Sequence, residues 1–158
     1  MENFEFHLPT RYIFGQGTSS KVGGIIQEYG YKKVLLVYGG NSARQSGLIS
    51  SVIEQLTVKG ISFMELSGVK PNPRADLVYE GIELCRRKEL EFILAVGGGS
   101  VIDSSKAIGY GVGYEGDVWD FFYTNDIHEA LPTANILTIP GTGSEAGANT
   151  VISNAETQ

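Results

Sequence analysis

The stretch FILAVGGGSVIDSSKAI, residues 92–108, runs from a short apolar segment through three glycines into a helical pattern. Phe92–Val96 is continuous and apolar, which predicts a strand buried on both faces of a sheet. Val101, Ser105 and Ile108 fall on one face of the helix that follows. Because glycines have no side chains, the backbone amides at the start of this helix can approach an anion closely. The stretch therefore predicts a binding site for a diphosphate.

Ser100 and Asp103 allow a second interpretation of the same turn. A serine followed three residues later by an aspartate matches a capping box, in which side chains satisfy the free helix amides without a ligand. A cap alone does not require three consecutive glycines, so the sequence favours the phosphate hypothesis. The two interpretations are compatible with each other.

The rest of the chain alternates between apolar strands and amphipathic helices. Strands are predicted at Lys33–Tyr38, Ile61–Leu66, Phe92–Val96 and Asn135–Ile139, with a short extended segment at Tyr12–Phe14. This alternation predicts an α/β, Rossmann-like domain with a mainly parallel sheet and helices on both faces. Residues 1–158 are expected to form one such domain, with its ligand at the carboxyl ends of the strands.

A second glycine-rich loop follows the strand predicted at Lys33–Tyr38, and it begins with Gly39, Gly40, Asn41 and Ser42. In dinucleotide folds an acid near such a strand end commonly holds the ribose hydroxyls. This loop has no acid, and Arg44 beside it is cationic. Small donors plus an arginine suit a 2′-phosphate, so the loop favours NADP(H) over NAD(H). The alternative is a plain Gly-Gly turn in which Ser42 caps the next helix.

A third loop, LTIPGTGSEAGANT at residues 137–150, again places glycines and hydroxyls after a strand. Thr138 and Thr142 could hydrogen-bond to phosphate, ribose or the nicotinamide amide. Glu145 could instead cap a helix that begins at Thr142 or Ser144.

The segment Pro71-Asn72-Pro73 forms a fourth loop. Two prolines restrict its backbone and fix the direction of Asn72. A rigid surface turn without a ligand explains the same residues equally well.

Composition excludes several classes of function. The formal net charge of −6 disfavours nucleic-acid binding, and no stretch approaches the about 20 apolar residues of a membrane span. The N-terminus does not resemble a secretory signal, and the single cysteine, Cys85, forms no disulfide framework and is expected in the core. These features predict a cytoplasmic protein. His7 and His128 are expected at the surface, and neither a Walker A lysine motif nor a zincin histidine pair is present.

Taken together, these stretches resemble a known family. GGGSVIDSSKAI, PNPR and PGTGSE, beginning at residues 97, 71 and 140, are similar in spacing to the N-terminal domain of iron-containing alcohol dehydrogenases. YGGNS at residues 38–42 and the opening TRYIFGQGT resemble the butanol dehydrogenase or aldehyde reductase branch, many members of which use NADPH. The match spans essentially the whole chain.

The resemblance implies roles for individual cofactor-binding residues. Gly39, Gly40 and Ser42 would lie by the adenosine ribose or its 2′-phosphate, with Asn41 in the place of a third glycine of that branch. Asn72 would lie near the adenine ribose, and Gly98, Gly99 and Ser100 would hold the diphosphate. Asp103 would face the nicotinamide and the substrate. The remaining expected contacts are Thr138, Thr142, Asn149 and Val151, and Ile139 replaces a threonine common in the family.

The resemblance also implies what this chain does not carry. The family's second domain is helical and supplies an aspartate and three histidines that bind Fe²⁺ or Zn²⁺, so we expect no catalytic or metal-binding residue in residues 1–158. The full-length protein is expected to oxidise a small alcohol or reduce an aldehyde, and the resemblance implies a homodimer. Two alternatives stay open: a dehydroquinate synthase-like or glycerol dehydrogenase-like enzyme of the same superfold, or a non-catalytic nucleotide-binding module.

Overall fold

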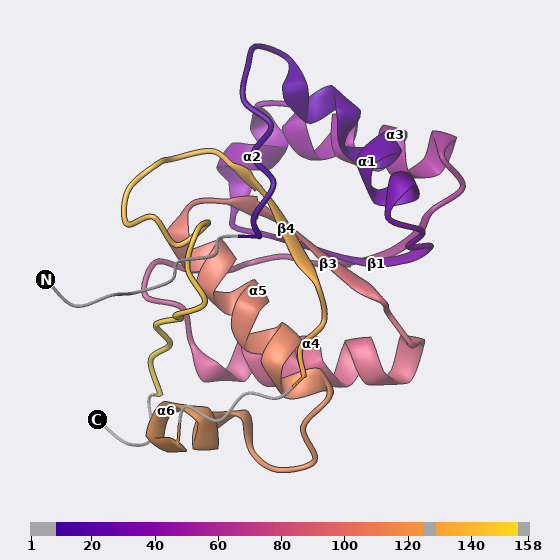
Figure 1. Ribbon diagram of the computed structural model, residues 1–158. Coiled ribbons are helices and arrows are strands. Elements are labelled where there is room, and N and C mark those ends of the chain that lie inside the picture. The colour runs from indigo at the N-terminus through magenta and orange to yellow at the C-terminus, as the bar shows by residue number, and fades with distance from the viewer. Residues whose placement is uncertain (1–8, 125–128, 155–158) are drawn as a thin grey trace, which may run out of the picture.

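The computed structural model describes residues 9–124 and 129–154, and in them a four-stranded parallel sheet is covered by helices on both faces (Figure 1). The strands are β1 (Lys33–Tyr38), β2 (Ser62–Leu66), β3 (Phe92–Gly97) and β4 (Thr133–Leu137). The α-helices are α1 (Val22–Glu28), α2 (Asn41–Gln45), α3 (Leu48–Val58), α4 (Ala75–Lys88), α5 (Gly99–Val112) and α6 (Phe121–Thr124). Short 3-10 turns occupy Thr18–Lys21 and Val118–Asp120. The predicted α/β architecture is confirmed, while His7 and His128 lie outside the described residues.

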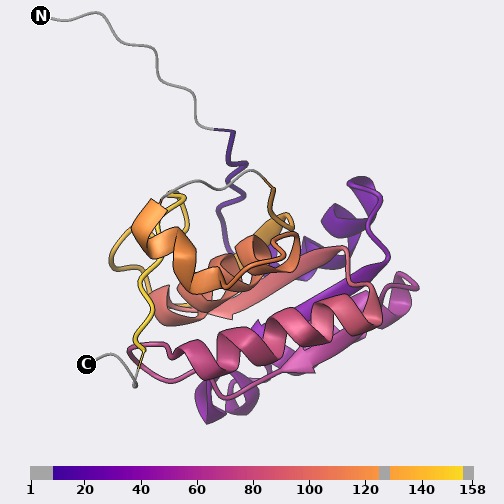
Figure 2. The ribbon, with the colours of Figure 1, turned by 90° about the horizontal axis from the view of Figure 1, so that it is seen from below.

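The two central strands divide the core into two layers. Along β1 and β3, alternate side chains point to opposite faces of the sheet, as the pleat requires. Leu35 and Ile93 belong to the cluster beneath α4 and α5, whereas Leu36 and Leu94 belong to the cluster beneath α1 and α3. Both strands are buried along nearly their whole length. Figure 2, viewed from below, shows helices on the two sides of the sheet.

The strand order β2-β1-β3-β4 creates a reversal point in the middle of the sheet. The chain leaves β1 toward β2 on one side and later returns to place β3 on the other side of β1. Right-handed crossovers therefore put α3 and α4 on opposite faces. The loops after β1 and β3 diverge at the carboxyl edge, and crevices of this kind bind ligands in open α/β sheets.

Two of the predicted extended segments differ in the structure. The last strand is Thr133–Leu137, two residues earlier than predicted, because its register follows β3: Ile93 pairs with Thr133 and Gly97 with Leu137. Beyond this pairing, only the Thr138 amide still donates to the Gly97 carbonyl, at 3.0 Å. Tyr12–Phe14 forms no strand with the described residues, and Phe14 is fully exposed.

The irregular stretch after α5 covers one end of the core with some of its aromatic side chains. Trp119 and Phe121 pack against the cluster beneath α4 and α5. Phe122 stacks on Trp119 with ring centroids 4.6 Å apart, whereas Tyr123 is largely exposed. No helix in residues 9–124 or 129–154 is long and apolar enough to cross a membrane.

Cys85 lies in α4 at the centre of its buried face and is 1% exposed. Burial raises the pKa of this thiol to about 12, so the thiol stays protonated at neutral pH. We expect the native chain to react very slowly with a thiol-specific disulfide reagent at about pH 8, and to release one equivalent once denaturant is added. Rapid reaction of the native chain would contradict the predicted core position.

Candidate functional site

The turn between β3 and α5 leaves the start of a long helix without a side-chain cap. Gly98 is the N-cap in an extended conformation, and no side chain hydrogen-bonds to the first amides. Its carbonyl accepts from the amides of Val101 and Ile102 at 3.0 and 3.2 Å. The alternative capping box at Ser100 and Asp103 is therefore wrong, because Ser100 already lies inside the helix. The amides at this helix start are left for an anion.

The three consecutive glycines have different surroundings. A Cβ added at Gly97 would lie 2.4 Å from Val101 Cγ2 and 2.7 Å from Val101 Cβ, so close packing requires glycine there. A Cβ at Gly99 would lie 3.4 Å from Thr142 Oγ1, and one at Gly98 would lie 3.6 Å from Ile139. Only Gly97 is required by the fold itself. Gly98 and Gly99 instead face the loop after β4.

The loop after β1 reaches the same edge of the sheet. β1 and β3 are neighbours, with Tyr38 opposite Val96, so Gly39 and Gly40 emerge beside the glycines of β3. The Gly39 carbonyl accepts from the Gly68 amide at 3.2 Å. A Cβ added at Gly40 would meet none of the described atoms within 4 Å, so this side of the loop is open. Asn41 and Ser42 form the first turn of α2.

A cluster of three side chains lies next to this loop and was not predicted. The Tyr38 hydroxyl donates to Glu65 Oε2 at 2.5 Å, and Arg44 Nη2 donates to the same Glu65 oxygen at 3.0 Å. Arg44 Nε also donates to the Tyr38 hydroxyl at 3.0 Å. Burial and the Glu65 carboxylate raise the pKa of Tyr38, so its hydroxyl remains a donor. An acid of β2 thus lies beside the loop and is paired with Tyr38 and Arg44.

The loop after β4 contains a turn rather than the predicted helix. The Ala146 amide donates to the Gly143 carbonyl at 2.9 Å, and Gly143 has a left-handed φ of 72°. Residues 144–146 form this turn, so Glu145 caps no helix. Thr138 and Thr142 are both exposed, and Thr142 faces Gly99. The structure therefore brings Thr142 to the helix start of α5.

Lys106 holds this loop onto α5, a role that the sequence analysis missed. Its side chain is only 9% exposed, and its Nζ donates to the Ser144 carbonyl at 3.0 Å, to Ser144 Oγ at 2.8 Å and to the Asn149 carbonyl. Asp103 Oδ1 lies 3.4 Å from Nζ and accepts from Ser144 Oγ at 2.5 Å. Burial lowers the pKa of Lys106, and the Asp103 carboxylate opposes part of that shift. The sequence feature that could have indicated this role is a lysine on a helix face whose other residues are apolar or small.

The remaining predicted residues lie along the C-terminal segment and the proline loop. The Thr150 hydroxyl donates to the Asp103 carbonyl at 2.8 Å, which brings Asn149 and Val151 past α5. Ser153 then pairs with the proline loop, because its amide donates to the Pro73 carbonyl at 2.7 Å. Asn72 has a left-handed φ of 56°, an uncommon conformation for a residue other than glycine. Within the described part of the chain, the exposed Asn72 side chain forms no hydrogen bond to the other predicted residues.

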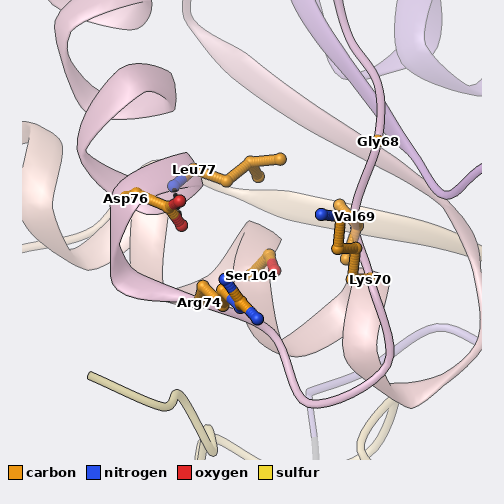
Figure 3. A pocket seen from close by; sticks show the side chains of 7 residues that line it. All are labelled: Gly68, Val69, Lys70, Arg74, Asp76, Leu77 and Ser104. Carbon is orange, nitrogen blue, oxygen red and sulfur yellow. Dashed lines mark hydrogen bonds between the residues drawn. The ribbon is translucent and has the colours of Figure 1, made fainter. Parts of the chain in front are cut away.

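A small pocket lies on the α4 side of this edge, between residues 68–70, the start of α4 and Ser104 of α5 (Figure 3). Its volume is about 70 Å³, well below the size of pockets that bury a drug-sized ligand. None of the predicted cofactor residues lines it. This pocket is therefore separate from the residues predicted to bind the cofactor.

A metal ion does not fit the described part of the chain. Residues 9–124 and 129–154 contain no group of three or more His, Cys, Asp or Glu side chains arranged to hold one. The arrangement does fit a dinucleotide, because an uncapped helix start, two unobstructed glycine positions and nearby hydroxyls meet at the reversal point of the sheet.

Comparison with known proteins identifies the family. Residues 9–158 match the model of the family described as iron-containing alcohol dehydrogenase. The chain belongs to this family. The match favours the alcohol dehydrogenase interpretation over the dehydroquinate synthase-like alternative.

The relatives that the chain is similar to include butanol dehydrogenases and an aldehyde reductase. It is 46% identical to the probable NADH-dependent butanol dehydrogenase 1 of Bacillus subtilis, covering 100% of this chain and 41% of that protein. It is 36% identical to the NADPH-dependent aldehyde reductase YqhD of Escherichia coli, covering 99% of this chain and 41% of that protein. The crystal structure of NADH-dependent butanol dehydrogenase A from Thermotoga maritima superposes with a TM-score of 0.96 at 47% identity, covering 99% of this chain and 40% of that one. The chain thus spans about two-fifths of the length of these relatives.

Replacing Lys106 by methionine is expected to loosen the loop at residues 141–150. The change leaves the Asp103 carboxylate without its cation and several carbonyls without their donor, which for a buried pair costs about 3 kcal/mol. We expect the free energy of unfolding to fall by that amount in denaturant titrations, with faster proteolysis within the loop.

Lys88→Met is the matched control, because Lys88 is exposed in the last turn of α4. This change should lower the free energy of unfolding by less than about 1 kcal/mol. Equal losses in the two variants would show that Lys106 does not anchor the loop.

Proposed function

We propose that this chain is the cofactor-binding part of an NAD(P)H-dependent alcohol dehydrogenase or aldehyde reductase of the butanol dehydrogenase type. The observation that carries the proposal is the uncapped start of α5, whose glycines face the threonine loop at the reversal point of the sheet. Family membership and the names of the relatives support it. The full-length protein is proposed to transfer a hydride between the nicotinamide and a primary alcohol or aldehyde.

Each loop has a proposed task in binding the dinucleotide. The first amides of α5, with Gly98, Gly99 and Ser100, bind the diphosphate, because a helix start attracts negative charge. Gly39, Gly40, Asn41 and Ser42 would lie along the adenosine ribose, and Asn72 near it. Thr138 and Thr142 hydrogen-bond to the cofactor from the opposite loop. Asn149 and Val151 would lie toward the nicotinamide, together with Asp103.

The nicotinamide supplies the hydride chemistry, and this chain binds and orients it. Lys106 fixes the Asp103 carboxylate and the backbone at residues 144–149 in one arrangement. Asp103 is thereby held as an acceptor at the nicotinamide end of the site. We propose that the ligands for Fe²⁺ or Zn²⁺ belong to the second domain of the family.

A preference for NADP(H) over NAD(H) stays a prediction. Arg44 and the neutral residues of the loop support it. The Glu65 carboxylate beside Arg44 opposes it, and the relatives named above include both NADH-dependent and NADPH-dependent enzymes. The other proposed properties are a cytoplasmic location, a small alcohol or aldehyde substrate and a homodimer, without nucleic-acid or membrane partners.

Fluorescence titration of the 158-residue chain with NADH and, separately, with NADPH tests the proposal. We expect binding of both dinucleotides and no alcohol-dependent turnover by the chain alone, because no metal site lies in its described residues. Tighter binding of NADPH would confirm the predicted preference. A Kd of about 1 mM corresponds to about 4 kcal/mol of binding free energy. If neither dinucleotide binds at that concentration, the proposed cofactor site is wrong.

Two glycine variants separate binding from folding. Gly99→Ala places a methyl group in the gap toward Thr142 without a clash, so we expect unchanged stability and roughly tenfold weaker NADH binding. Gly97→Ala forces the methyl against Val101 and should lower the free energy of unfolding by about 1–3 kcal/mol. Circular dichroism melts and NADH titrations measure both. Unchanged NADH affinity in Gly99→Ala would argue against a diphosphate at this turn.

A further inference from the structure

The cluster of Tyr38, Arg44 and Glu65 joins β1, α2 and β2 at the carboxyl edge of the sheet. Tyr38 is the last residue of β1, Arg44 lies in α2 and Glu65 is the next-to-last residue of β2. β1 and β2 are paired with Leu36 opposite Glu65, which brings Glu65 to the level of the Tyr38 hydroxyl. Gly39 follows Tyr38 directly, so the cluster lies beside the loop proposed to hold the adenosine ribose.

Contacts within the cluster fix the direction of the arginine. The Tyr38 ring is fully buried, and its hydroxyl is bound by both Arg44 and Glu65. The Arg44 guanidinium lies over the ring, with its central carbon 5.1 Å from the ring centroid. Arg44 Nη2 and Glu65 Oε2 are 3.0 Å apart, and their side chains are 58% and 36% exposed. The guanidinium is therefore turned toward a carboxylate but remains within reach of solvent.

A 2′-phosphate at the proposed ribose position would meet both charges of this cluster. Arg44 would attract the phosphate, and Glu65 would repel it while holding Arg44 as its own partner. An exposed ion pair of this kind is worth at most about 1 kcal/mol, so a dianion can compete for the arginine. A 2′-hydroxyl carries no charge, and Glu65 Oε2 already accepts from Tyr38 and Arg44, so neither charge acts on it appreciably. The cluster thus acts on one cofactor and leaves the other unaffected.

We propose that Glu65 is a specificity-determining residue that weakens binding of the 2′-phosphorylated cofactor by occupying Arg44. This inference rests on the proposed function, and it names a residue that adjusts the relative affinities for the two cofactors. Glu65 lies on β2, outside the glycine-rich loops. Its effect on cofactor choice depends on the pairing of β2 with β1, which brings it to Arg44.

The test compares Kd values for NADPH and NADH in the wild-type chain and in Glu65→Gln. Glutamine keeps an acceptor for the Tyr38 hydroxyl but removes the negative charge. We expect the Kd for NADPH to fall by roughly three- to tenfold and the Kd for NADH to stay unchanged. This gain in NADPH affinity should shrink at high salt, because salt screens exposed charges. An unchanged NADPH affinity, or equal gains for both cofactors, would overturn the inference.

Two further variants identify the route of the effect. Arg44→Gln removes the cation that would attract the 2′-phosphate, so NADPH should bind several-fold more weakly while NADH is unaffected. In the double variant the gain of Glu65→Gln should disappear if it acts through Arg44. Persistence of the full gain would assign it to general repulsion and overturn the role of Arg44.

Glu89→Gln is the matched control. It makes the same chemical change in a glutamate that is ion-paired with Lys33 at 2.9 Å, at the opposite end of β1. Neither Kd should change in this variant, and a gain equal to that of Glu65→Gln would overturn the inference. If the wild-type chain binds neither dinucleotide, the proposed function fails and this inference fails with it. If both bind but their ratio does not respond to Glu65, only the inference fails.

Discussion

The parallel pairing of β1 with β3 is the constraint on which the rest of this structure depends. Tyr38 lies opposite Val96, so the two glycine-rich loops that follow are adjacent although they are far apart in sequence. Both strands are buried on both faces, so their register cannot slip without exposing apolar side chains. The crossover helices leave on opposite faces, and the edge between the loops stays open. Every residue proposed to touch the cofactor is placed directly or indirectly by this pairing.

A second constraint is the buried ammonium group of Lys106. Four acceptors from the loop after β4 surround it: the carbonyls of Ser144, Gly147 and Asn149 and the hydroxyl of Ser144. A loop with three glycines between residues 141 and 150 and no helix of its own would otherwise have many accessible conformations. The cation selects one of them and aligns it with α5. Order in this part of the site thus comes from a charge rather than from apolar packing.

Sequence patterns located the fold well because its strongest signals are local. The apolar runs of β1 and β3 and the glycines after them predict both the strands and the loops. β4 was displaced by two residues because its half-buried side chains give a weak pattern and its register is set by β3. Glu65 lies 21 residues from Arg44, and the loop acceptors of Lys106 lie 38 or more residues away, so no local pattern could reveal these contacts. The capping box failed because the extended Gly98 begins the helix before Ser100.

The fastening of the C-terminal loop to α5 has a thermodynamic consequence. Lys106, Tyr110 and Thr150 all tie that loop to the same helix whose first turn is open to an anion. Helix and loop then form one cooperative unit, which opens and closes together. A ligand seated at the first turn adds its binding free energy to the whole unit, by about 2.7 kcal/mol at a hundredfold excess over its dissociation constant. The cofactor would therefore also stabilise those residues of the helix and the loop that it does not contact.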